Sequence, residues 1–230
     1  MKKLLAIWLI LALLLVPGMA LGAEVTVETD QEKLAGDWFA QVRGMDLVLT
    51  LTVEGTYALQ IGTEITQGTW TLTDGAVYLD GSETPSLYPV GEKLAWWAMG
   101  LFLTREQSVG AYVPAELLGE EVPADAFNGY WTCLFVDVGG TILPACELNE
   151  VTDVYVQAPR AALGGPLFGD VGVDMTFENG TMIFVESDVS VTLALQTDGL
   201  MRMTLVAPDT ALILYLMPTY AQGASPVPEA

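Results

Sequence analysis

Residues 171–205 read VGVDMTFENGTMIFVESDVSVTLALQTDGLMRMTL, and this stretch decides the fold. Apolar and polar side chains alternate along three runs within it, which is the period of a half-buried β-strand. The pairs Asn179-Gly180 and Asp198-Gly199 interrupt the alternation, and such pairs are strong signals for tight hairpin turns. The stretch therefore predicts an antiparallel meander of short strands.

The first half of the chain carries the same pattern. Alternation over residues 47–53, 56–61 and 68–72 predicts three strands, and Asp74-Gly75 marks another hairpin. Shorter apolar runs bring the expected total for this half to about eight strands. Because no helical period of useful length follows the N-terminal segment, the sequence predicts an all-β protein.

Two similar motifs divide the chain into two copies of one plan. Leu34–Trp38 (LAGDW) begins the first folded stretch, and Phe127–Trp131 (FNGYW) begins the second. The segment between the two meanders contains prolines and shows no strand alternation until its end, so we place the boundary there. The predicted parts are a signal peptide (1–23), a first β-domain (31–106), a linker (107–123), a second β-domain (124–220) and a disordered tail (221–230).

An antiparallel meander leaves two unpaired sheet edges, and a set of eight strands removes both edges by closing into a barrel. The sequence therefore predicts two small eight-stranded meander barrels in tandem. Strands of only about five or six residues make short barrels. We expect their own side chains to fill them, with space for at most one small ligand.

The N-terminus has the order of a secretory signal peptide. Lysines at positions 2 and 3 precede the uninterrupted apolar run Leu4–Val16, and small residues follow up to a cleavage point after Gly22 or Ala23. The run is short for a membrane span, although an uncleaved anchor is the alternative. No cysteine lies near the cleavage point to accept a lipid. We expect a secreted protein without a membrane span after cleavage.

Charge and composition exclude several classes of function. The 230 residues include 29 acidic and 8 basic residues and no histidine, and the formal net charge is −21. The missing histidine excludes Ser-His-Asp and Cys-His catalysis and every His-ligated metal site. The acidity argues against binding to the phosphate backbone of nucleic acids. Because 52% of the residues are hydrophobic, the chain can bury a core, and its scattered acids favour a soluble, self-repelling monomer.

Three stretches carry a resemblance to a known family: Leu34–Trp38, Gly68–Leu72 (GTWTL) and Gly129–Gly140 (GYWTCLFVDVGG). The chain resembles the short tandem lipocalin-like domains of exported proteins from anaerobic Gram-positive bacteria, over most of its length after the signal peptide. The resemblance implies binding or surface display rather than catalysis. It also implies that Trp38 and Trp131 plug the closed ends of the two barrels.

Adjacent aromatic residues mark a candidate ligand or partner surface. Trp96 and Trp97 lie next to each other in a predicted strand, so their side chains point to opposite faces and cannot share one core. We expect one of them outside the barrel or at the interface between the domains, with Tyr88 extending the same surface. An exposed aromatic side chain can stack on a sugar or anchor a partner, and interdomain packing is the alternative.

Cys133 and Cys146 are the only cysteines. A disulfide between them in an exported chain would contribute roughly 3 kcal/mol through loop-closure entropy. Cys133 is also in phase with Trp131 and Phe135, so two buried thiols fit the pattern equally well. The sequence leaves both states open. Two thiols without histidine make a poor metal site, and we expect no cofactor.

The function expected from these features is that of an exported, non-catalytic binding or surface-interaction protein whose ligand, if it has one, is small and apolar. The alternative is a carbohydrate-binding module that uses exposed aromatic residues. An acid-based hydrolase ranks last. Asp170 and Asp174 share one strand face, but nothing in the sequence places them in a cleft with a raised pKa.

Overall fold

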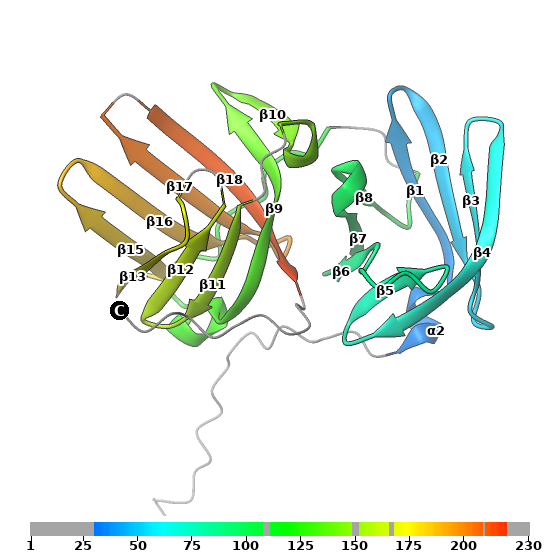
Figure 1. The fold of residues 1–230 in the computed structure, drawn as a ribbon, viewed down its shortest axis with the longest axis horizontal. Coiled ribbons are helices and arrows are strands. Elements are labelled where there is room, and N and C mark those ends of the chain that lie inside the picture. The colour runs from blue at the N-terminus through cyan, green and yellow to red at the C-terminus, as the bar shows by residue number, and fades with distance from the viewer. Residues whose placement is uncertain (1–29, 108–110, 149–151, 166–167, 209, 220–230) are drawn as a thin grey trace, which may run out of the picture.

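The computed structural model describes residues 30–107, 111–148, 152–165, 168–208 and 210–219. It is an all-β protein, as the alternation predicts, with two units side by side (Figure 1). The predicted signal peptide and tail lie outside the described residues. Within the described part of the chain, no helix has the length and apolar character that a membrane crossing requires.

The first unit contains eight strands, which run antiparallel in chain order and follow the short helix α2 (Gln31–Leu34). They are β1 (Gly36–Val42), β2 (Met45–Leu51), β3 (Thr56–Ile61), β4 (Glu64–Thr73), β5 (Ala76–Leu79), β6 (Tyr88–Val90), β7 (Lys93–Trp96) and β8 (Leu101–Leu103). Strands β1–β5 form one curled sheet and β6–β8 form a second. Single bridges join the two sheets, from Val77 to Leu87 and from Phe39 to Thr104.

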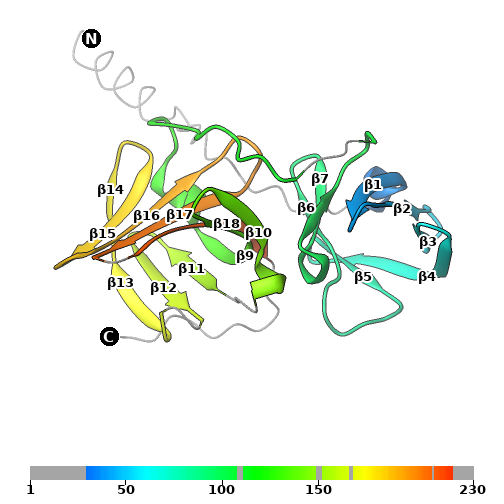
Figure 2. The same cartoon turned by 90° about the horizontal axis from the view of Figure 1, so that it is seen from above.

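The second unit is a nearly closed barrel. Its strands are β9 (Gly129–Val138), β10 (Thr141–Pro144), β11 (Asp153–Gln157), β12 (Arg160–Gly164), β13 (Val171–Asp174), β14 (Thr176–Glu178), β15 (Thr181–Glu186), β16 (Val189–Leu195), β17 (Met201–Ala207) and β18 (Thr210–Thr219). Nine of them follow the order β13-β12-β11-β9-β18-β17-β16-β15-β14, and β10 pairs only with β9. Met175 alone separates β13 from β14 in the chain, so the two ends of this path meet (Figure 2).

The predicted pair of eight-stranded barrels is not confirmed. The first unit divides its eight strands between two sheets, and the second unit has nine strands in its ring and a tenth beside it. The alternation hides the break between β13 and β14 because Met175 is buried and keeps the strand period. Its backbone N–H leaves the β14–β15 ladder and donates instead to the Pro159 carbonyl, at 2.8 Å.

Two of the predicted hairpin turns are present as two-residue turns, whereas Asp198-Gly199 lies in a longer connection between Leu195 of β16 and Met201 of β17. Asp74 and Gly75 connect β4 to β5 with φ angles of 49° and 75°, and Asn179 and Gly180 connect β14 to β15 with 50° and 72°. Left-handed conformations at both central residues match the twist of the flanking strands, and Asn-Gly and Asp-Gly adopt them at low cost. The local sequence therefore fixes these two turns.

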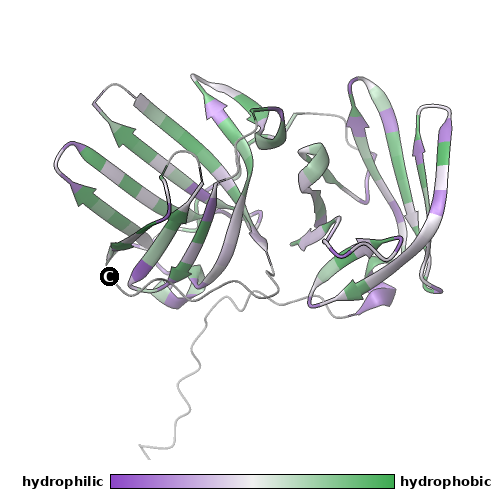
Figure 3. Ribbon diagram, in the orientation of Figure 1, coloured by the Kyte–Doolittle hydropathy of each residue, from purple (hydrophilic) through white to green (hydrophobic). Residues whose placement is uncertain are grey.

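Apolar residues alternate with polar ones along the strands, as the green bands in Figure 3 show, and the buried apolar side chains form the core of each unit. Separate buried clusters occupy the first unit and the second barrel. A third cluster lies between the units. Its buried members are Val90, Ala95, Leu134, Phe135, Leu200, Tyr215 and Met217. The two units are therefore packed together and do not merely share a chain.

Part of the predicted linker is bound to the second unit. The Leu118 N–H donates to the Leu195 carbonyl, and the Thr197 N–H donates to the Glu116 carbonyl, both at 2.9 Å. These bonds hold residues 111–118 against the end of β16. The 3₁₀-helix η2 (Ala124–Phe127) then leads into β9, close to the expected start of the second domain.

Each unit begins with the same hydrogen-bonded corner. The indole Nε1–H of Trp38 donates to the Leu34 carbonyl at 2.8 Å, and that of Trp131 donates to the Phe127 carbonyl at 2.9 Å. Both tryptophans are 3% exposed. In each case the acceptor ends a short helical turn, whose last carbonyls have no partner within the helix. The tryptophan therefore fastens the entry turn to the first strand of its unit.

Replacing Trp131 with phenylalanine should destabilise the second unit. The variant leaves the buried Phe127 carbonyl without its donor and opens a small void, which together cost about 2–3 kcal/mol of unfolding free energy. Trp38→Phe should have the same effect in the first unit. Urea denaturation followed by circular dichroism measures both, with Val53→Ala, at a side chain 53% exposed, as the control. A Trp131→Phe midpoint equal to that of the control would refute a structural role for the indole bond.

Candidate functional site

The wall of the second barrel separates at one end. Strand β13 pairs with β12 while β14 pairs with β15, so β13 and β15 diverge on the N-terminal side of Met175. A pocket of about 710 Å³ lies at this divergence. Its lining includes Leu163, Phe168, Val173, Phe184, Val185 and Val189. We call this pocket the mouth of the second barrel.

The mouth and the Trp131 corner lie at opposite ends of the barrel. Neighbouring strands run antiparallel, so the end at which β9 begins is also the end at which β12 begins. The mouth lies where β12 and β15 end, beside Ser187 of the turn that leads to β16. Trp131 is therefore buried at one end of the barrel, and the pocket lies at the other.

The mouth exposes apolar surface above a buried floor. Val171, Val185 and Val189 are 42%, 67% and 37% exposed, whereas Leu163 and Val191 below them are 2% and 1% exposed. Contiguous apolar surface of this kind marks binding sites on soluble proteins. A volume of this size falls within the range of about 300–1,000 Å³ that is typical of small-molecule pockets.

Carboxylates surround the mouth. Asp174 and Glu186 line it, and Asp188 lies in the adjoining turn. Asp174 lies at the end of β13 away from Ser187, where it pairs in register with Arg160, the first residue of β12, and Arg160 Nε lies 3.0 Å from Asp174 Oδ1. The side chain of Asp170 faces β12, because a Cβ on Gly164 would lie 3.1 Å from its Oδ1. Acidic residues therefore outnumber basic ones around the mouth.

A different pocket, of about 800 Å³, lies beside Trp38 in the first unit and is lined by Lys33, Lys93 and Arg105. The guanidinium of Arg105 lies 3.8 Å from the centroid of the Trp38 ring, and Nη2 donates to the Lys33 carbonyl at 2.6 Å. Burial lowers the pKa of Arg105 below its usual value. Because Arg105 covers the tryptophan and bonds to the backbone, its role here is to support the Trp38 corner.

The predicted aromatic surface is largely used for packing. Trp97 contacts the cluster between the units, and its Nε1–H donates to the Cys133 carbonyl at 3.0 Å. Tyr88 packs against the same cluster, and burial raises its pKa to about 12. Trp96 instead contacts the core of the first unit. All three side chains are partly buried, and the two tryptophans contact different cores. The predicted strand ends between them, because Trp96 is the last residue of β7 and Trp97 is the first residue of the 3₁₀-helix η1 (Trp97–Met99).

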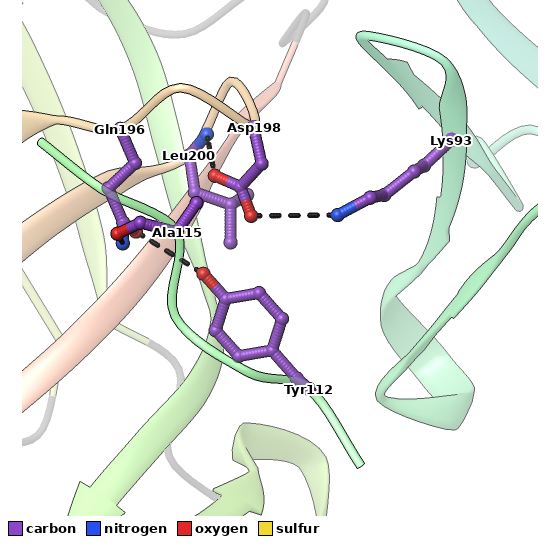
Figure 4. A network of polar contacts seen from close by, with 6 residues as sticks. All are labelled: Lys93, Tyr112, Ala115, Gln196, Asp198 and Leu200. Atoms are coloured by element: carbon purple, nitrogen blue, oxygen red, sulfur yellow. Dashed lines mark hydrogen bonds and ion pairs between the residues drawn. The ribbon is translucent and has the colours of Figure 1, made fainter. Parts of the chain in front are cut away.

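Further residues of this interface did not stand out in the sequence. Lys93 Nζ lies 3.6 Å from Asp198 Oδ2 across the two units (Figure 4). Tyr112 donates to Gln196 Oε1 at 3.3 Å, and Gln196 Nε2 donates to the Ala115 carbonyl at 2.8 Å. The partners are far apart in sequence, so no spacing rule connects them. Together they fix the predicted linker and the first unit to the second unit.

A pocket of about 410 Å³ remains within this interface, lined in part by Phe102, Tyr112, Phe135 and Ile142. The rings of Tyr112 and Phe135 are stacked, with centroids 4.6 Å apart, and Lys93 Nζ lies 4.9 Å from the centroid of the Phe102 ring. The aromatic rings and the ammonium group therefore contact one another across the interface and leave only a small space between them.

Both cysteines are free thiols in the structure, with Cys133 buried and Cys146 partly buried. Burial raises the pKa of Cys146, and the neighbouring Glu147 carboxylate adds to the shift. A Cβ on Gly100 would lie 2.9 Å from Cys146 Sγ, so the first unit covers this thiol. Among the described residues, no three His, Cys, Asp or Glu side chains are grouped so as to hold a metal ion.

Comparisons with known proteins found no matching family model, no matching curated protein and no matching solved structure.

Trp97→Ala should open the interface without unfolding either unit. The substitution removes the ring that donates to the Cys133 carbonyl, and loss of this large, partly buried side chain costs about 2 kcal/mol, less than loss of a tryptophan from a core. The thiol of Cys146 should then react with iodoacetamide at least several-fold faster, as measured by mass spectrometry in the native state. Val53→Ala serves as the control. Unchanged labelling in Trp97→Ala would mean that Trp97 does not hold the units together.

Proposed function

We propose that this protein is a non-catalytic binding protein that holds a small apolar ligand at the mouth of its second barrel. The observation that carries the proposal is the position of the mouth, an apolar pocket of about 710 Å³ at the end of the barrel opposite Trp131. A barrel plugged at one end and accessible at the other suits a single small ligand.

The barrels are of the lipocalin-like, eight-stranded type in this proposal. The second unit matches the eight-stranded plan if β13 and β14, which Met175 alone separates, are counted as one bent strand. The strand β10 is then counted as part of a side hairpin. The first unit matches the eight-stranded plan if the bridges Val77–Leu87 and Phe39–Thr104 count as the closing pairs between its two sheets. The repeated tryptophan corner supports a common plan for both units.

Export belongs to the same proposal and is supported by the sequence alone. The lysines at positions 2 and 3 and the apolar run Leu4–Val16 form the signal, and a strongly acidic chain stays soluble and monomeric outside the cell. The absence of histidine from the whole sequence supports a role in binding rather than in catalysis. The same acidity supports a partner other than nucleic acid.

The carbohydrate-binding alternative drew on exposed aromatic residues. Trp96, Trp97 and Tyr88 are partly buried, and two of them contact the cluster between the units. A sugar-stacking platform needs an open ring face. The geometry therefore favours the apolar ligand at the mouth over a glycan at this surface.

Val189→Asn should weaken binding of the neutral dye N-phenyl-1-naphthylamine about tenfold, because Val189 shares a strand face with the buried Val191, and an amide in the apolar lining costs roughly 1.4 kcal/mol on dehydration. Fluorescence titration of the full chain measures the affinity. The control is Val53→Asn at an exposed valine of the first unit, which should bind as the parent protein does. If the parent protein does not bind the dye, or both variants bind equally, the mouth is not the binding site.

A further inference from the structure

We propose that the mouth of the second barrel selects a cationic amphiphile, an apolar chain or ring system with a positively charged head group, over an anionic one such as a fatty acid. This inference rests on the proposed function and names the chemical class of its ligand. It follows from two properties of the mouth, its apolar depth and the charge around its opening.

The depth of the mouth accommodates the apolar part. Leu163, Val173 and Val191 form a buried floor, and Phe168 and Phe184 contribute ring surface above it. These side chains offer no hydrogen-bond partner to a polar head group. A polar or charged head group must therefore remain at the opening, where charged residues follow the exposed Val185 along the chain.

The opening carries an excess of negative charge. The carboxylate of Glu186 lines it at the end of β15, and Asp170 and Asp188 lie in the loop before β13 and in the turn after β15, at the same end of the strands. The Arg160–Asp174 ion pair lies at the other end of β13, where β12 begins. Exposed charges act over about one Debye length, roughly 10 Å at 0.1 M salt, so we expect these three carboxylates to act on a head group at the opening.

An anionic head group would find no free cation there. Besides Arg160, the chain beyond residue 110 contains one basic residue, Arg202. Arg202 pairs in register with Ala194 and Tyr215, near the end at which β17 begins, which is the end away from the mouth. A carboxylate head would therefore meet only like charge, while an ammonium head would be attracted and steered to the opening.

Displacement of N-phenyl-1-naphthylamine from the full chain tests the inference. The competitors are dodecyltrimethylammonium, dodecanol and dodecanoate, which share one chain length and differ in head-group charge, each used below its micellar concentration. The ammonium should bind most tightly and the carboxylate most weakly, with roughly a tenfold difference between them at low ionic strength. The difference should shrink to about twofold in 0.5 M NaCl, because salt screens exposed charges.

Removing negative charge from the opening should reduce the preference for the ammonium competitor over the carboxylate competitor. Glu186→Gln combined with Asp188→Asn should reduce the ammonium-to-carboxylate ratio about threefold while leaving dodecanol unchanged. The matched control, Glu54→Gln combined with Glu64→Gln, removes two exposed acids from the first unit and should retain the full ratio. Dodecanoate binding as tightly as the ammonium, or equal ratios in both double variants, would overturn the charge preference. Failure of the dye itself to bind would instead overturn the proposed function.

Discussion

The hydrogen bond from a buried indole to the carbonyl four residues earlier is the interaction on which both units depend. It joins Trp38 to Leu34 and Trp131 to Phe127, at 2.8 and 2.9 Å. A short helical turn at the start of a barrel is marginal alone, because its carbonyls have no partners. The indole supplies the partner, and the same ring is buried in the core of its unit. The same tryptophan thus satisfies a buried carbonyl and buries apolar surface.

The second barrel has an accessible pocket at the end away from Trp131. The strands β13 and β15 diverge near Met175, and the apolar lining between them is left partly exposed. The interior beneath is filled by its own side chains, so any ligand must sit at the mouth rather than deep inside. In our proposal, the acidic residues at this opening then favour a ligand with a positively charged head group.

The aromatic residues between the units serve in packing, whereas the mouth is the candidate binding site. Trp97, Tyr88 and Tyr112 pack against Phe135 and its neighbours in one apolar cluster. The pair Lys93–Asp198 lies at the edge of this cluster, where a partly exposed ion pair contributes little, about 0–1 kcal/mol. Burial of the rings therefore dominates the energetics of the interface, and the second unit keeps its mouth free of the first.

The sequence by itself determined the elements that depend on near neighbours. Period-two alternation identified the strands, Asp74-Gly75 and Asn179-Gly180 identified hairpins, and the repeated motif around Trp38 and Trp131 identified the two units, because each of these signals acts over a few residues. Only the tertiary structure decided how the first unit divides into two sheets, where β13 leaves β15, and which rings meet between the units. Those outcomes depend on contacts between residues far apart in the chain, such as Trp97 with Cys133, for which a local pattern carries no signal.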